Sequence, residues 1–207
     1  MKIANHKLVH DDGTPYPFKA SPNLGGPILS HDYLIIHYTE GQTVKGAVEW
    51  LTSHESKVSA HLVIGRDGSM FQLVPFDRTA VHTGRSQWQG RKGLARYSIG
   101  IELDNAGKMS RKGVKWVSGF GKAYPESDIL EGVHKFGARK YGWHMYPQAQ
   151  LEAAAEVAAV LVREYGIGEI LGHDDIAPKR KWDPGPAFPT DQFRATVAGM
   201  LTAAQQG

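Results

Sequence analysis

Hydrophobic residues along this chain recur at two spacings, one typical of buried strands and one typical of amphipathic helices. The apolar run YLIIHY at residues 33–38 lies between turn-forming residues, which predicts a buried strand ending near a histidine. Residues 60–64 and 70–74 are further strand candidates, and the Asp-Gly dipeptide between them predicts a hairpin turn. A fourth strand with alternating faces is expected at residues 98–103, SIGIEL.

Helical spacing marks three other segments. Apolar residues at positions i, i+3, i+4 and i+7 predict an amphipathic helix over residues 43–54. Residues 151–165 form the strongest helical pattern, which Gly166 ends, and a terminal helix is expected from about residue 193. A short strand is expected at residues 170–171. Because strands and helices are interleaved, the pattern predicts an α/β (α+β) domain with one mostly buried central sheet and flanking helices.

Two segments lack clear periodicity. Residues 11–30 are dense in Pro, Gly, Ser and Asp, so residues 1–30 are expected to form an irregular N-terminal arm. Residues 107–147 are rich in Gly, Lys and aromatic residues, which indicates an insertion or lid with one short helix near residues 129–141. Since 207 residues fit one domain, residues 1–207 are expected to be a single domain.

Composition narrows the possible chemistry. Apolar content of 41% with 22% charged residues is ordinary for a globular protein. The formal net charge of +3 is small, whereas a nucleic-acid-binding protein usually concentrates positive charge on one face, so no nucleic-acid partner is expected. The chain has no cysteine, so any metal ion must be bound by His, Asp or Glu.

The N-terminal residues 1–10 lack the apolar core of a signal peptide, and no apolar run approaches the roughly 20 residues that cross a membrane. We therefore expect a chain that is cytoplasmic as synthesised, with no membrane span. No coiled-coil pattern is present, so a monomer is the default expectation.

The ten histidines are the richest source of candidate chemistry. A histidine taken alone is more often a surface or core residue than a ligand, and those in polar or irregular segments keep that interpretation. His37, His61, His82 and His173 differ, because each lies in a predicted strand or in a turn beside one. Ends of adjacent strands meet at one edge of a sheet, where α/β proteins place their sites.

The strongest local signal follows His173, in the segment GHDDIAPKRKWDPGPAF. Asp183 lies there between Pro178 and Pro184, and a loop bounded by prolines loses little freedom when it holds a ligand. The alternative is an ordinary surface loop whose aspartates are solvated. Two histidines and one carboxylate with an open fourth position form a familiar catalytic zinc site, which His37, His173 and Asp183 would supply.

A hydrolytic metal site also needs acid–base and charge-stabilising groups. Glu102 is a charged residue inside the predicted strand SIGIEL, where it would activate water or, alternatively, form a salt bridge at the strand end. Lys181 could stabilise an oxyanion, although a lysine in a KRK run usually faces solvent. The HExxH motif of zinc peptidases is absent, which disfavours that class.

Five segments occur in a fixed order: IIHYT, SAHLVIGRDG, AVHTGRS, SIGIELDN and GHDDIAPKRKWDPGPAF. Together they resemble the zinc-dependent N-acetylmuramoyl-L-alanine amidases of the amidase-2 type, over about residues 33–188 without residues 107–147. The resemblance implies a central mixed β-sheet flanked by helices, with a zinc groove on one side. It also implies hydrolysis of the amide bond between N-acetylmuramic acid and L-alanine in peptidoglycan or muropeptides, with Zn2+ as cofactor.

The resemblance assigns roles position by position. Residues that match the family's zinc ligands are His37, His173 and Asp183. Residues that match its water-activating acid and its transition-state-stabilising lysine are Glu102 and Lys181. Residues expected to bind or border the substrate are Tyr38, His61, Arg66 and His82.

The resemblance leaves two alternatives, one for the activity and one for the biological role. The same scaffold also occurs in recognition modules that bind muropeptide without cutting it, but such relatives lose metal ligands that are present here. A cytosolic recycling enzyme and a wall-lytic endolysin released through a holin both lack signal peptides. We expect a bacteriolytic enzyme of bacterial or phage origin, with residues 107–147 shaping the groove.

Overall fold

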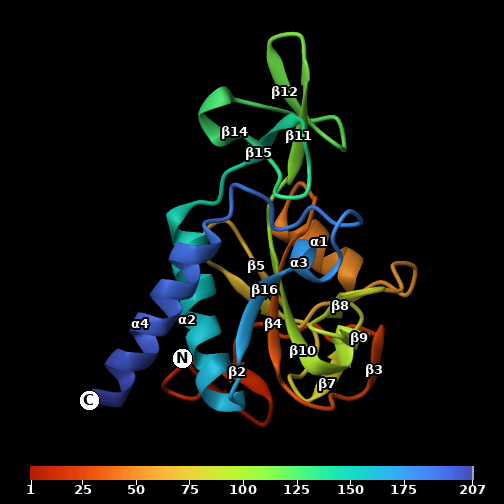
Figure 1. Ribbon diagram of the computed structural model, residues 1–207. Helices are drawn as coiled ribbons and strands as arrows, with labels where there is room; N and C mark the ends of the chain where they lie inside the picture. The colour runs from red at the N-terminus through yellow and green to blue at the C-terminus, as the bar shows by residue number, and fades with distance from the viewer. Residues whose placement is uncertain (207) are drawn as a thin grey trace.

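A five-stranded sheet runs through the main body of the protein in the computed structural model, which describes residues 1–206 (Figure 1). Its strands are β4 (Tyr33–Tyr38), β5 (Leu62–Ile64), β6 (Met70–Gln72), β10 (Ser98–Leu103) and β16 (Glu169–Gly172). The order is β16-β4-β10-β5-β6, in which only the β5–β6 pair is antiparallel. The prediction of a central mixed sheet is therefore confirmed, as is the Asp-Gly hairpin between β5 and β6.

Each face of this sheet has its own covering layer. Alternate residues of β10, Ile99, Ile101 and Leu103, point into the largest apolar core. Helices α2 (Gln148–Tyr165) and α4 (Thr190–Gln206) lie side by side over that face (Figure 1). The opposite face of the sheet is the one that carries the polar side chains of β4 and β10.

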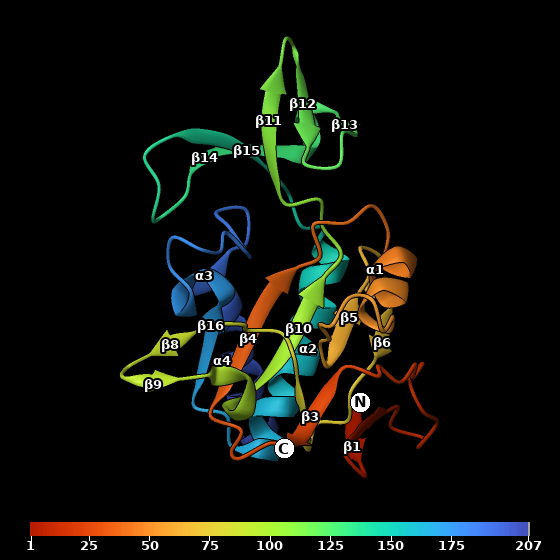
Figure 2. The same cartoon turned by 90° about the vertical axis from the view of Figure 1, so that its right-hand side faces the viewer.

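Two short helices cover the polar face only in part. Helix α1 (Val44–Leu51) begins after Thr43, whose hydroxyl accepts a hydrogen bond from the Gly46 N–H, and it packs on the β5 side of the sheet. Helix α3 (His173–Ile176) and the 3-10 turn η1 (Leu94–Tyr97) pack on the β16 side. The carboxyl ends of β4 and β10 lie between α1 and α3 (Figure 2), and residues of both strand ends line a cavity.

The N-terminal segment is more regular than residues 1–30 were expected to be. It contains β1 (Lys2–Ala4), β2 (Lys7–Val9) and β3 (Leu24–Pro27), which pairs with β7 (Arg78–Ala80). The side-chain oxygen of Gln72 accepts a 2.8 Å hydrogen bond from the Leu8 N–H, and Leu8 is buried. Tertiary contacts of this kind order a segment whose composition alone predicts a loop. A small hairpin, β8 (Gln87–Trp88) and β9 (Arg91–Lys92), was also not expected.

Residues 107–147 form a second sheet that rises above the main body, and we call them the β11–β15 lobe (Figures 1 and 2). Its elements are β11 (Lys108–Lys112), β12 (Lys115–Ser118), β13 (Ala123–Tyr124), the turn η2 (Glu126–Asp128), β14 (Ile129–Val133) and β15 (Lys140–His144). All strand pairs are antiparallel in the order β13-β12-β11-β15-β14. The helix predicted near residues 129–141 is wrong, because this stretch forms β14 and part of β15.

The packing of the lobe explains why residues 107–147 show no clear hydrophobic periodicity. On one face of its sheet Met109 and Trp116 are buried, and partly buried Ile129 packs against them. Trp143 pairs with Lys108 and therefore lies on the opposite face, where it is also buried. Glycine and lysine residues interrupt the apolar positions along these strands. Elsewhere the expected helices are found within a few residues of their predicted bounds. Among residues 1–206, no helix is both long and apolar enough to span a membrane.

Substitution of Gly142 by Ala is expected to overpack the lobe core. A Cβ atom at Gly142 would lie 2.7 Å from the Trp116 ring and 2.8 Å from Ile129. Overpacking of this kind lowers the free energy of unfolding by about 1–3 kcal/mol. Denaturant unfolding measures the loss, and hydrogen exchange is expected to place it in β11–β15. The control is Gly199→Ala in exposed α4, where nothing lies within 4 Å and helix propensity predicts a small gain.

Candidate metal centre and groove

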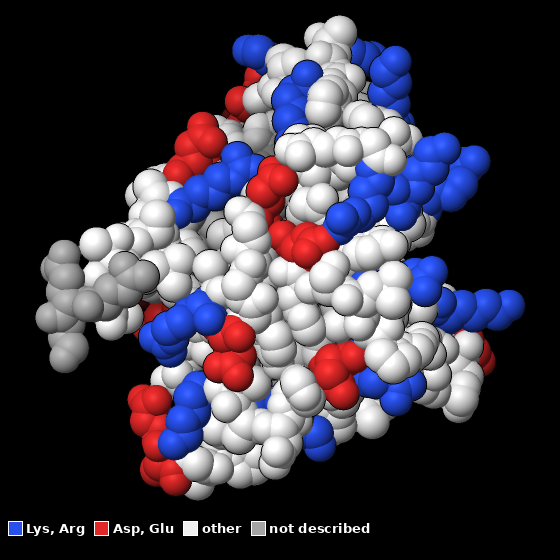
Figure 3. Space-filling model, turned by 60° about the horizontal axis from the view of Figure 1, so that its bottom comes forward, with Lys and Arg blue, Asp and Glu red and all other residues white. Residues whose placement is uncertain are grey.

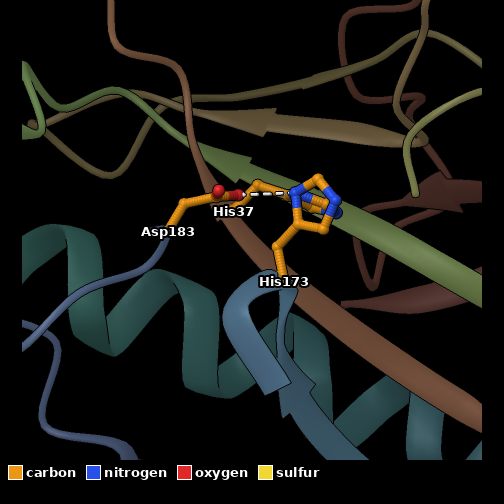
Figure 4. Close-up of side chains that lie close together, drawn as sticks. All are labelled: His37, His173 and Asp183. Atoms are coloured by element: carbon orange, nitrogen blue, oxygen red, sulfur yellow. Dashed lines mark hydrogen bonds and ion pairs between the residues drawn. The ribbon is translucent and has the colours of Figure 1, made fainter. Parts of the chain in front are cut away.

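Three buried side chains meet at the carboxyl end of β4 (Figure 4). His37 Nδ1 lies 2.9 Å from His173 Nδ1 and 3.0 Å from Asp183 Oδ2, and His173 Nδ1 lies 2.9 Å from the same oxygen. One ligand atom from each residue lies within 4.8 Å of the other two. The structure thus brings together the three residues that the sequence marked as metal ligands, from positions far apart in the chain.

The atoms that face one another in this cluster fit a bound cation. His173 Nε2 lies 3.1 Å from the Thr83 carbonyl oxygen, and because a carbonyl only accepts, Nε2 carries the proton and Nδ1 presents a lone pair. The Asp183 carboxylate is also an acceptor. Tetrahedral ligands about 2.1 Å from a metal ion lie about 3.4 Å apart, so a small widening of the cluster would admit one.

Local backbone geometry explains how His173 and Asp183 reach each other. His173 begins α3 directly after β16, and the Asp174 N–H donates a 2.8 Å hydrogen bond to the Asp183 carbonyl. Gly172 is required at this turn, since a Cβ atom there would lie 2.3 Å from Asp174 Oδ1 and 2.7 Å from Pro184. The tight turn therefore seats the loop of Asp183 on the strand that delivers His173.

The β11–β15 lobe holds the other side of the same loop. Trp182 packs against His134 and Trp143, with ring centroids 4.9 Å and 6.3 Å apart. Buried His134 Nε2 lies 2.9 Å from the carboxylate of buried Asp174, beside His173. The lobe is thus part of the structure that positions Asp183.

A cavity of about 470 Å³ opens over the three ligands, a volume suited to a small ligand. It is bounded by α1, by the ends of β4 and β10, by the Asp183 loop and by the root of the lobe. Among its lining residues are four further predicted site residues, Tyr38, His82, Glu102 and Lys181. We refer to this cavity as the groove.

Glu102 faces the groove because it pairs in register with His37 on the neighbouring parallel strand. Its Oε2 atom is buried and has no hydrogen-bond partner among the described residues. Burial and the Asp183 carboxylate raise the pKa of Glu102 well above its usual range, while Lys181 opposes the shift. A carboxyl group with a raised pKa in a cleft is a candidate general acid or base.

His37 and Asp183 carry the protonation states that a metal ion requires. Burial, aided by His173, lowers the pKa of His37 to about 4, so its imidazole is neutral at pH 7. Burial acts to raise the pKa of Asp183, but contacts with His173 and His37 outweigh it and lower that pKa. Neutral imidazoles and an ionised carboxylate are the forms that bind metal ions.

Two of the residues expected to contact a substrate lie elsewhere. His61 is fully buried, where its Nδ1 accepts from the Gly100 N–H and its Nε2 faces the Arg78 carbonyl. Arg66 lines a separate polar cavity at the root of the lobe and donates a 3.1 Å hydrogen bond to the Met145 carbonyl. Neither residue borders the groove.

Other residues border the groove although the sequence did not single them out. Among them are Trp50 on α1, Lys108 on β11, and Arg180 and Trp182 in the Asp183 loop. The ammonium of Lys108 lies 4.3 Å from the Trp182 ring centroid and 4.7 Å from that of Tyr141. Lys108 lies in the segment without periodicity, so no pattern could place it. The exposed Trp50 on a predicted amphipathic helix was a signal that could have been used.

Fold and site together define an α+β protein that carries, at one end of a mixed sheet, a His-His-Asp group that could hold one metal ion. The chain belongs to the N-acetylmuramoyl-L-alanine amidase family Amidase_2, whose sequence profile matches residues 26–186. The resemblance read from the five ordered segments is therefore confirmed.

Individual relatives agree with this assignment. The 1,6-anhydro-N-acetylmuramyl-L-alanine amidase AmpD of Salmonella typhimurium (strain SL1344) is 37% identical over 144 residues, which is 69% of this chain and 58% of the relative. The chain thus spans less than two thirds of that relative's length.

Solved structures show the same fold. A crystal structure of a Se-Met AmpD derivative is similar with a TM-score of 0.66 at 27% identity, over 95% of this chain and 99% of that one. AmiD from E. coli, in complex with the substrate anhydro-N-acetylmuramic acid-L-Ala-D-gamma-Glu-L-Lys, gives a TM-score of 0.61 at 28% identity, over 86% of this chain and 58% of that one.

The ligand cluster predicts that each chain binds one divalent transition-metal ion. Because the metal binds the folded state, free metal at about 100 times its Kd is expected to add about 2.7 kcal/mol to the free energy of unfolding. Metal analysis and thermal unfolding with and without a chelator measure both effects. His173→Ala should lose the bound metal and the stabilisation, whereas exposed His54→Ala should keep them. Equal metal content in the two variants would contradict the assignment.

Proposed function

We propose that this chain is a zinc-dependent amidase that hydrolyses the bond between N-acetylmuramic acid and L-alanine in muropeptides. The observation that carries the proposal is the meeting, in one groove, of three groups: a His-His-Asp cluster, the partly buried carboxyl group of Glu102 and a lysine. The buried Oε2 atom of Glu102 has no hydrogen-bond partner among the described residues. The family membership and the names of the relatives support the same reaction.

His37, His173 and Asp183 would hold the zinc ion. Zinc bound by three protein ligands supplies a Lewis acid for the scissile carbonyl and lowers the pKa of a water molecule at the open position to near 7. Two imidazoles and one carboxylate without cysteine form one of the ligand sets that zinc accepts.

The chain's own groups would manage the protons and the charge. As the C–O bond forms, Glu102 accepts the proton from the attacking water, and as the C–N bond breaks it passes that proton to the leaving amine of L-alanine. The raised pKa of Glu102 suits a group that must hold a proton between these steps. Lys181, whose charge acts on both His37 and Glu102, would stabilise the negative charge on the carbonyl oxygen.

The form of the substrate follows from the relatives and the groove. AmpD is named for a 1,6-anhydro-N-acetylmuramyl substrate, and the AmiD structure contains an anhydromuramyl peptide. Neither supports the endolysin or bacteriolytic role expected from the sequence. A cavity of about 470 Å³ bounded by the lobe favours a soluble sugar–peptide fragment over a cross-linked network.

We propose that the lobe acts as an insertion that shapes the groove for an acidic peptide. Residues 107–147 contain eight Lys or Arg residues against three Asp or Glu residues, while the whole chain has 24 against 21. Figure 3 shows Lys and Arg side chains over much of the face that it draws, several of them at its upper edge. Of these residues, Lys108 lines the groove, where its ammonium would attract the carboxylates of a peptide stem.

The alternative is a recognition module that binds muropeptide without cutting it. Such a module has no need of a carboxyl oxygen kept buried without a hydrogen bond beside a metal cluster, since that arrangement costs folding free energy. The Oε2 atom of Glu102, buried and unpaired within the described residues, therefore favours the enzyme.

Glu102→Gln separates the two functions. It keeps the size of the side chain but cannot accept the proton, so the rate of peptide release is expected to fall about 10²–10⁴-fold while zinc content stays at the wild-type level. Chromatography of the released peptide and metal analysis measure the two quantities. Glu164→Gln, an exposed site on α2, is the control and should release peptide at the wild-type rate. A zinc-loaded wild-type protein that binds muropeptide but releases no peptide would instead establish the recognition module.

Turnover of soluble anhydromuropeptide is expected to exceed turnover of intact sacculi. In the same assay Lys108→Met should raise KM for the soluble substrate about tenfold, a loss of about 1.4 kcal/mol in binding, with little change in kcat. Lys112→Met, at an exposed position on the same strand, is the matched control. Faster release from sacculi would refute the assignment to soluble fragments, and an unchanged KM would remove Lys108 from substrate binding.

A further inference from the structure

A chain of buried hydrogen bonds leads away from the metal cluster behind His37. His37 Nε2 lies 2.9 Å from His82 Nδ1, and His82 Nε2 lies 3.3 Å from Ser98 Oγ. The Ser98 hydroxyl in turn donates a 2.8 Å hydrogen bond to the Leu94 carbonyl oxygen. The three residues that contribute side chains to this series are buried, with relative exposures of 1% for His37, 8% for His82 and 0% for Ser98. Water therefore does not replace these contacts.

The Leu94 carbonyl group, at the far end of this series of hydrogen bonds, fixes the direction of each bond in it. The Leu94 carbonyl only accepts, so it takes the single hydroxyl proton of Ser98. Ser98 Oγ can then only accept a hydrogen bond from His82, which places the imidazole proton of His82 on Nε2 and leaves Nδ1 unprotonated. The unprotonated Nδ1 accepts a hydrogen bond from His37 Nε2. His37 therefore carries its proton on Nε2 and presents the lone pair of Nδ1 to His173 and Asp183.

Packing holds His82 in the position that this chain requires. Its ring lies directly over Gly100 of β10, where an added Cβ atom would lie 2.4 Å from His82 Nδ1. Gly100 has Ser98 and Glu102 as its neighbours on the same face of the strand. The absence of a side chain at Gly100 thus makes room for the ring of His82, which contacts His37.

From these contacts we infer that His82 and Ser98 are positioning residues that select the tautomer of His37 in which Nδ1 binds the metal ion. The inference rests on the proposed zinc site and adds a role for two residues that do not themselves bind the ion. His173 reaches the same tautomer directly, through the Thr83 carbonyl. Both histidine ligands are therefore oriented by peptide carbonyl groups, one directly and one through two side chains. Outer hydrogen bonds of this kind fix the ring and raise the basicity of a metal-binding histidine.

Nuclear magnetic resonance of 15N-labelled imidazoles reads the tautomers directly. We expect His37 and His82 to carry their protons on Nε2 in the wild-type protein, both with zinc and without it. In Ser98→Ala the His82 ring loses its acceptor, so a population with the proton on Nδ1 is expected to appear in the metal-free protein. A wild-type His82 protonated on Nδ1, or an unchanged tautomer in Ser98→Ala, would overturn the inference.

Zinc affinity gives a second measurement, by competition with a chromophoric chelator. Ser98→Ala and His82→Leu are each expected to weaken zinc binding about 10–100-fold. His82→Gln keeps an acceptor for His37 and a donor for Ser98, so it should restore most of the affinity. Ser21→Ala is the matched control, because Ser21 is equally buried and its hydroxyl also donates to a backbone carbonyl, that of Leu51.

The outcomes distinguish this inference from the proposed function. Lower thermal stability with wild-type zinc affinity in Ser98→Ala and His82→Leu would show a merely structural role and refute the inference, while the amidase proposal would stand. If the wild-type chain bound no zinc, the proposed function would fail, and the tautomers of the metal-free protein would still decide whether His82 and Ser98 orient His37. Loss of affinity that His82→Gln restores supports the inference.

Discussion

Because β4 and β10 pair in a parallel register that sets His37 beside Glu102, the candidate metal ligand and the proposed proton acceptor leave the sheet on the same face. If both strands shifted by one residue relative to the rest of the sheet, His37 and Glu102 would face α2, and apolar residues such as Ile36 and Ile101 would face the groove. The apolar core under α2 excludes this slip, since it needs those residues where they are. Burial on one face thus specifies the chemistry on the other.

The Asp183 loop depends on contacts from two directions. The sheet fixes it through the bond between Asp174 and the Asp183 carbonyl, and the lobe fixes it through Trp182 and the pair of His134 with Asp174. A loop held only by the sheet would keep the freedom that a ligand must lose on binding. The lobe therefore contributes to the metal centre as well as to the groove wall.

The sequence predicted most of the central sheet, because buried strands and helices have strong periodic patterns. It also predicted the cluster of His37, His173 and Asp183: strand ends and a proline-bounded loop made these residues candidates, and the resemblance to the amidase family decided the assignment. The lobe was predicted incorrectly because its short strands bury side chains on both faces, Met109 and Trp116 on one and Trp143 on the other, so no simple apolar–polar alternation marks them. His61 and Arg66 were placed at the substrate by resemblance, yet strand packing buries the first and the second borders another cavity. Single-residue placement of this kind depends on tertiary contacts that no local pattern encodes.

The negative charges of the two carboxyl groups in the groove, Asp183 and Glu102, are compensated unevenly. This difference links the His37–His173–Asp183 cluster to Glu102. Asp183 stays ionised because two histidines contact it, so the cost of bringing two carboxyl groups close together out of water falls mainly on Glu102. Burial and the Asp183 charge both raise the pKa of Glu102, and only Lys181 opposes them. A dication between the three ligands would offset the Asp183 charge and remove one of these two causes. The pKa of Glu102 would then fall toward the range in which a carboxylate can accept a proton at neutral pH. Occupancy of the cluster and readiness of Glu102 are therefore coupled through charge, although Glu102 is not a ligand.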